Sequence, residues 1–142
     1  MVYANSAFFI FYIQGTSLYC RVIDPAAVGT STGAEVALIT SASLGGLNFD
    51  ACAFGTNAVM VTYAWADGVT SVRTIKVIRT GTVPSISVGP TNLFTEANVP
   101  VATITALCCA AFSNATNAGA FVTSTGAAAQ AGLAGVVIDT TY

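Results

Sequence analysis

Asn57-Ala-Val-Met-Val-Thr-Tyr-Ala-Trp65 is the stretch that decides the fold, because it is a Val- and Tyr-rich segment that leads into a hairpin signal, Ala66-Asp67-Gly68. Two other segments share its pattern of an initial Asn, an apolar run and a polar turn: Asn5 to Ile13 and Asn117 to Thr125. A pattern that occurs three times in one chain predicts a repeat architecture.

A second strand-like signature follows each copy, namely Arg21-Val-Ile-Asp24, Lys76-Val-Ile-Arg79 and Val136-Val-Ile-Asp139. From the Asn to the Ile of this signature there are 21 positions in the second and third copies, and 18 in the first. The Asn residues recur after 52 and 60 positions, near the period of roughly 50 residues in kelch repeats. We predict a single repeat domain over 1–142, with copies at about 5–48, 49–101 and 102–142, either complete or a piece of a larger protein or assembly.

One period, Phe49 to Val101, contains four strand signals separated by turn residues. Along the chain we expect strands near 5–13, 16–24, 35–41, 48–55, 57–65, 71–79, 84–89, 102–112, 117–123 and 133–139, with 126–135 as a hairpin loop. Four antiparallel strands per repeat predict an all-β fold of β-propeller-like blades, about two and a half of them, with a β-sandwich as the alternative. Because a propeller ring needs roughly four to eight blades, the ring would have to be completed by other polypeptide.

The composition is apolar and almost uncharged: 54% of residues are hydrophobic, 7% are charged and none is His. Ordinary soluble domains are about 25% charged, so this surface is either covered by small polar residues or hidden against other protein. A net charge of -2 with four cations leaves no basic footprint for nucleic acid. No apolar run reaches the roughly 20 residues of a membrane-spanning helix.

Catalysis and metal binding are not expected, and we predict no enzyme, no catalytic residue, no metal and no cofactor. Without His there is no Ser–His nucleophile, and neither a phosphate loop nor a calcium loop occurs. The thiols of Cys20, Cys52, Cys108 and Cys109 lie among apolar neighbours without Cys-x-x-Cys spacing, which favours core packing in a reduced, intracellularly made protein. The charges at one shared repeat position are interpreted as solvated strand ends: Asp24, Arg79 and Asp139.

Aromatic side chains near strand ends and hairpins are candidates for contact with a ligand such as a host cell-surface glycan: Trp65, Tyr63, Tyr12 and Tyr19. For Trp65 the competing and preferred interpretation is a cap on the core between blades. The two terminal strands carry neither charge nor Pro, so their edges are expected to be covered by neighbouring polypeptide. These predicted assembly edges comprise Phe8, Phe9, Ile10, Phe11 and Tyr12 in the first strand, and Val136, Val137 and Ile138 in the last.

Phe49 to Tyr63 and Lys76 to Gly89 resemble a family of blade-like repeats found in tail-fibre and other virion appendage proteins of bacteriophages, and in large bacterial surface proteins. The shared pattern is an apolar strand, a turn, a Val-rich strand ending in Tyr, a hairpin, a Val-Ile strand and a Gly-Thr-x-x-x-x-x-Val-Gly segment. The chain departs from it at Gly55-Thr56 and Ser113-Asn114, where an Asp-Ser or Asp-Gly turn is usual.

This resemblance implies a structural or receptor-binding component of a bacteriophage virion appendage, of the tail-fibre or spike type, which acts in assembly and host attachment. The expected location is the virion or an extracellular surface, and the expected partners are copies of the chain or other virion subunits. Two alternatives stay open: a self-assembling extracellular filament or surface-layer protein, and a lectin-like propeller.

Overall fold

A computed structural model describes residues 1–27, 33–40, 44–66, 70–94, 103–112, 117–125 and 131–139. Eleven strands and no helix occur among these residues, so the predicted all-β class is confirmed for them. No helix long and apolar enough to cross a membrane occurs in the same segments.

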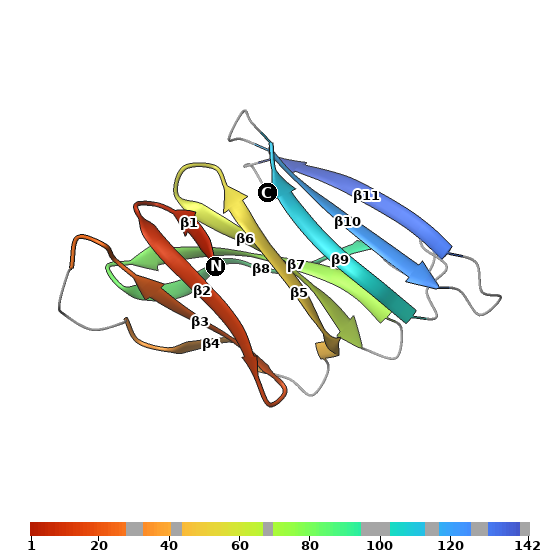
Figure 1. The fold of residues 1–142 in the computed structure, drawn as a ribbon, viewed down its shortest axis with the longest axis horizontal. Coiled ribbons are helices and arrows are strands. Elements are labelled where there is room, and N and C mark those ends of the chain that lie inside the picture. The colour runs from red at the N-terminus through yellow and green to blue at the C-terminus, as the bar shows by residue number, and fades with distance from the viewer. Residues whose placement is uncertain are drawn as a thin grey trace.

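Three antiparallel sheets follow one another along the chain (Figure 1). Sheet A contains β1 (Val2–Ala4), β2 (Ala7–Gln14), β3 (Ser17–Ile23) and β4 (Val36–Thr40) in this order. Sheet B contains β5 (Leu44–Phe54), β6 (Ala58–Ala66), β7 (Thr70–Thr80) and β8 (Val83–Phe94). Sheet C contains β9 (Thr103–Ala111), β10 (Asn117–Thr125) and β11 (Ala131–Asp139). Sheets A and B are therefore four-stranded meanders, as predicted, and the described strands form no closed propeller.

Tight hairpins connect the strands within each sheet. Asn5 and Ser6 join β1 to β2 with φ angles of 48° and 55°, as a two-residue type I′ hairpin requires. Gly15 and Gly81, with φ of 62° and 60°, open the turns after β2 and β7. The predicted antiparallel pairing of β6 with β7 is confirmed, while residues 67–69 of its turn lie outside the described segments.

Several elements differ from the sequence-based expectation. Strand β5 begins at Leu44 rather than near 48, and β8 continues to Phe94 rather than ending near 89. The three-residue strand β1 was not predicted, because it is too short to show alternation. Strand β11 begins at Ala131, so the second half of 126–135 is strand rather than hairpin loop. Its partner explains the difference: Ala131 pairs with Thr125 in a ladder that continues to Asp139, and such a ladder overrides the weak strand propensity of Ala and Gly.

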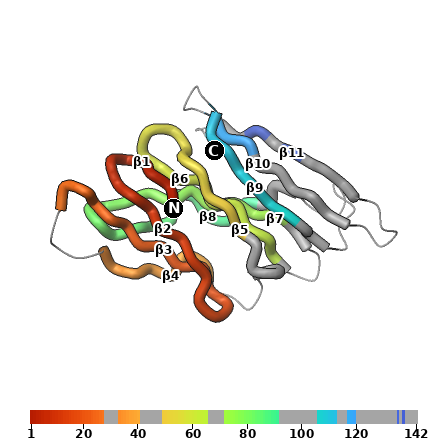
Figure 2. Tube along the Cα trace, in the orientation of Figure 1, coloured from red at the N-terminus to blue at the C-terminus, as the bar shows by residue number. Residues whose placement is uncertain are grey.

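Sheet B is the middle layer of the molecule (Figure 2). One of its faces packs against sheet A in a core that includes Phe9, Val22, Val61 and Val77. Its other face contributes to a smaller core with sheet C, made by Cys52, Phe54, Met60, Cys109 and Ala118. Every residue from 58 to 64 is at most 3% exposed, because both faces of β6 are covered.

Arg79 of sheet B forms hydrogen bonds and an ion pair with residues next to the strands of sheet A. Its guanidinium donates to the Asn5 carbonyl at 2.7 and 3.0 Å and forms an ion pair with Asp24 at 2.9 Å. The Asp24 carboxylate also accepts the N–H of Ala26, and these two hydrogen bonds, first the one from Arg79, lower the pKa of Asp24. The interpretation of Asp24 and Arg79 as solvated strand ends is therefore wrong, because the inter-sheet approach brings them together.

Candidate functional site

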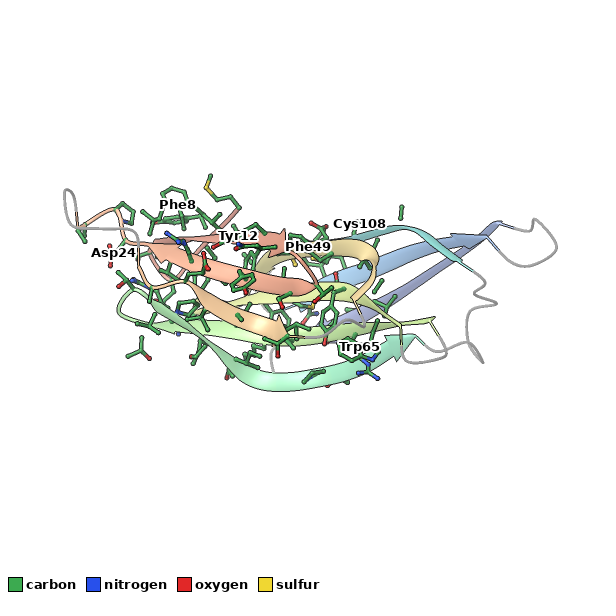
Figure 3. The ribbon with its side chains drawn as sticks, turned by 90° about the horizontal axis from the view of Figure 1, so that it is seen from below. Phe8, Tyr12, Asp24, Phe49, Trp65 and Cys108 are labelled. Carbon is green, nitrogen blue, oxygen red and sulfur yellow. The ribbon has the colours of Figure 1, made fainter. Side chains whose placement is uncertain are left out.

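The outer face of sheet A is an apolar surface that no other described sheet covers. Side chains of β2 alternate between the two sides of the sheet: Phe9 and Phe11 are buried toward sheet B, whereas Phe8, Ile10 and Tyr12 point outward and are partly exposed. Figure 3 shows Phe8 and Tyr12 on the side of the molecule away from β8.

Aromatic pairs line this outer face. Tyr12 pairs with Tyr19 across β2 and β3, and their rings stack with centroids 5.8 Å apart and an interplanar angle of 15°. Tyr3 of β1 lies 5.0 Å from Phe8, measured between ring centroids, and is 57% exposed. The sheet thus presents a row of aromatic side chains, of the kind that interfaces favour because each ring contributes a large contact area.

A compact polar cluster is set into this surface. The Tyr12 hydroxyl donates a hydrogen bond to the Glu35 carboxylate, and the Arg21 guanidinium forms an ion pair with Glu35 at 3.0 Å. The hydrogen bond from Tyr12, and then that from Arg21, lower the pKa of Glu35; the bond to Glu35 raises the pKa of Tyr12. Because the two charges neutralise each other, the outer face of sheet A carries almost no net charge.

The four aromatic candidates do not form one platform. Tyr12 and Tyr19 share the outer face of sheet A, but Tyr63 is completely buried between sheets A and B. Trp65 packs at the border of that core, in edge-to-face contact with Tyr63 at 6.1 Å and beneath the Arg73 guanidinium at 4.5 Å. Its position agrees with the preferred interpretation of a core cap, and only the Tyr12–Tyr19 pair lies on an open surface.

The predicted assembly edges lie at different places in their sheets. Phe8 and Phe9 pair with β1, which has only three residues and ends opposite Phe9. In the described structure, the backbone of β2 from Ile10 to Tyr12 therefore has no partner strand on the side of β1. Strand β11, which contains Val136, Val137 and Ile138, is the edge of sheet C, and Val137 is 60% exposed. Coverage of these edges by another polypeptide stays a prediction.

The thiols are distributed between the sheets rather than gathered in one site. Burial raises the pKa of Cys20 to about 12. Cys52 of sheet B and Cys109 of sheet C are hydrogen-bonded neighbours, and this bond together with burial raises the pKa of Cys109. The Cys109 N–H also donates to the Asp50 carboxylate at 2.7 Å, which ties β9 to β5. Within the described segments, no group of three or more potential metal ligands is found.

Comparisons with protein-family models, curated proteins and solved structures return no match to this chain. The resemblance to blade-like repeats of phage appendages therefore stays a prediction.

Proposed function

We propose that the chain is a structural or receptor-binding component of a bacteriophage virion appendage, of the tail-fibre or spike type, that acts through protein–protein packing and surface adhesion. In this proposal sheets A and B are two blades, and sheet C is a partial third, of an open propeller-like array. The expected partners are copies of the chain or other appendage subunits.

The observation that carries the proposal is the aromatic outer face of sheet A, which none of the described strands covers. Exposed apolar patches of this kind mark interaction sites in soluble proteins. Charge does little to oppose association, because Arg21 and Arg79, two of the four cations, are already paired with carboxylates. Low charge and apolar end surfaces suit a subunit that is packed among others.

A self-assembling filament or surface-layer protein is supported by the same face, so the test must separate the two settings. An antibody raised against the purified chain should be used to label particles from the source culture in negative-stain electron microscopy. Label on the appendage of a particle that contains nucleic acid is the expected result. Label on polymers without nucleic acid would replace the proposal by the filament alternative, and a free monomer that binds a glycan array would replace it by the lectin-like one.

A further inference from the structure

The outer face of sheet A corresponds, position by position, to a face that is an interface in sheet B. The count starts from the residue that closes the first hairpin of each sheet: Ala7, paired with Ala4, and Ala58, paired with Phe54. One, three and five residues further on lie Phe8, Ile10 and Tyr12 in β2, and Val59, Val61 and Tyr63 in β6.

The third strands extend this correspondence. Phe8 pairs with Ile23, as Val59 pairs with Val77; Tyr12 pairs with Tyr19, as Tyr63 pairs with Arg73. In sheet B the face formed by these positions is buried beneath sheet A, and Val59, Val61 and Tyr63 are all 0% exposed. In sheet A the β2 positions hold comparably apolar side chains that are only partly buried. One partner differs, because Arg21 lies opposite Ile10 where Ile75 lies opposite Val61, and Arg21 is neutralised by its ion pair with Glu35.

The surface that fits this face follows from the order of the stack. Sheet A contacts sheet B through side chains that lie two and four positions after Ala7, namely Phe9 and Phe11. Sheet B contacts sheet C in the same way through Met60, which lies two positions after Ala58. In sheet C the first ladder pair is Ala111 with Ala118, and Ala118 packs in the core shared with sheet B. The neighbouring residue Gly119 is itself buried, but it belongs to the opposite face of β10, which is turned away from sheet B.

This free face of sheet C also includes the residues paired with Gly119 and their neighbours on the same side. Ala110 and Val137 are the partners of Gly119, and Cys108 lies two residues before Ala110. All three are exposed, and the sequence contains no charged residue between Glu96 and Asp139. Figure 3 shows the Cys108 side chain projecting from the sheet.

We infer that the outer face of sheet A binds the free face of sheet C of a second copy of the chain, head to tail. The inference rests on the proposed function as a packing subunit and names the surface that performs the packing. Each copy would then continue the succession of sheets A, B and C into the next. Because the two surfaces differ, such contacts generate a closed ring or an open fibre rather than a two-fold dimer.

Cross-linking of the full chain tests the pairing of the two faces. The substitution Ile10→Cys places a thiol on the outer face of sheet A, and Cys108 supplies one on the free face of sheet C. A short bis-maleimide forms one thioether with each thiol, so no oxidant is needed. The expected product is a ladder of oligomers in which peptide mapping links position 10 of one copy to Cys108 of the next. The Ile10→Cys/Cys108→Ser double variant should lose the ladder.

Links between two copies of position 10, or no intermolecular link at all, would overturn the inference. A second measurement uses Ile10→Asp, with Ser85→Asp on the exposed side of β8 as the matched control. We expect Ile10→Asp, but not Ser85→Asp, to weaken self-association at least about tenfold by sedimentation velocity. A parent chain that stays monomeric at about 100 μM would also overturn the head-to-tail contact. Particle labelling would be unaffected by that failure, so it would leave the proposed function standing.

Discussion

Tyr12 and Tyr63 occupy the same position in two sheets of the same design, yet one lies on an open face and the other is completely buried. Within the described segments, sheet B is covered by sheet A on one face and by sheet C on the other, whereas sheet A packs against another sheet through one face only. The difference shows that the place of a sheet in the stack decides the burial of its second strand, since Phe8, Ile10 and Tyr12 are similar in type to Val59, Val61 and Tyr63.

The largest expected difference between the two sheets is in stability. Tyr63→Ala removes a side chain from the centre of the main core and should lower the free energy of unfolding by about 3–5 kcal/mol. Tyr12→Ala removes the same atoms from the outer face, with the stacking on Tyr19 and the hydrogen bond to Glu35, and should lower the free energy of unfolding by only about 1 kcal/mol. Urea denaturation of both variants at low micromolar concentration measures the contrast, and equal losses would contradict the layer order.

The link between sheets A and B should contribute less than their core. Arg79→Met removes the hydrogen bonds to the Asn5 carbonyl and should cost about 2 kcal/mol, because the carbonyl loses a charged donor. Arg21→Met is the matched control, because Arg21 pairs with Glu35 within sheet A on the outer face. The same denaturation experiment compares them, and a larger effect at Arg21 would refute the role given to Arg79.

Acid should weaken the same link. The pKa of Asp24 is lowered in the folded protein by the hydrogen bonds from Arg79 and the Ala26 N–H, relative to about 3.9 in an unfolded chain. The pair therefore stabilises the fold fully above about pH 4, and this stabilisation is lost as the pH falls through the lowered pKa. Asp24→Asn should flatten the pH dependence of the unfolding free energy between about pH 5 and 2. An unchanged slope would show that Asp24 is not paired.

The smallest effect concerns the thiols. Mild oxidation with oxidised glutathione should join Cys52 to Cys109, with release of two reduced glutathione molecules, because the two thiols are in contact across sheets B and C. Cys20 should stay unmodified, since it is buried and its pKa is raised to about 12. Mass spectrometry of tryptic peptides identifies the bond; a bond from Cys52 to Cys20 instead would contradict the stacking order.

The strands of sheet B could be predicted because their side chains alternate. In β7, Ile75 and Val77 pack toward sheet A, while Val72 and Thr74 are buried on the opposite face, as a period of two residues requires. The antiparallel pairing of β6 with β7 could be predicted as well, because an Asp-Gly pair between two strand-like segments is typical of a hairpin.

The matching of faces between copies could not be predicted from the strands alone. Alignment on Asn5 and Asn57 places Ala7 with Val59, whereas the hairpin-closing pairs place Ala7 with Ala58. The first hairpin loop has two residues in sheet A and three in sheet B, and a slip of one residue exchanges the two faces of a strand.

The polar contacts were missed for a different reason. Arg79 reaches Asp24 and Asn5, which are 55 and 74 positions away in the sequence. Glu35, in the segment before β4, forms an ion pair with Arg21, and no local spacing in the sequence predicts this contact. Such contacts depend on how sheets and loops come together, so a repeat pattern places the charges on strand ends without pairing them.

Methyl nuclear Overhauser effects from β6 test the central claim, that sheet B lies between sheets A and C. Met60 and Val61 are adjacent, and their side chains point to opposite faces. We predict contacts of the Val61 methyls with sheet A core residues such as Phe9 or Val22, and of the Met60 methyl with Ala118 of sheet C. Contacts of both residues with a single sheet, or with sheet B alone, would contradict the account.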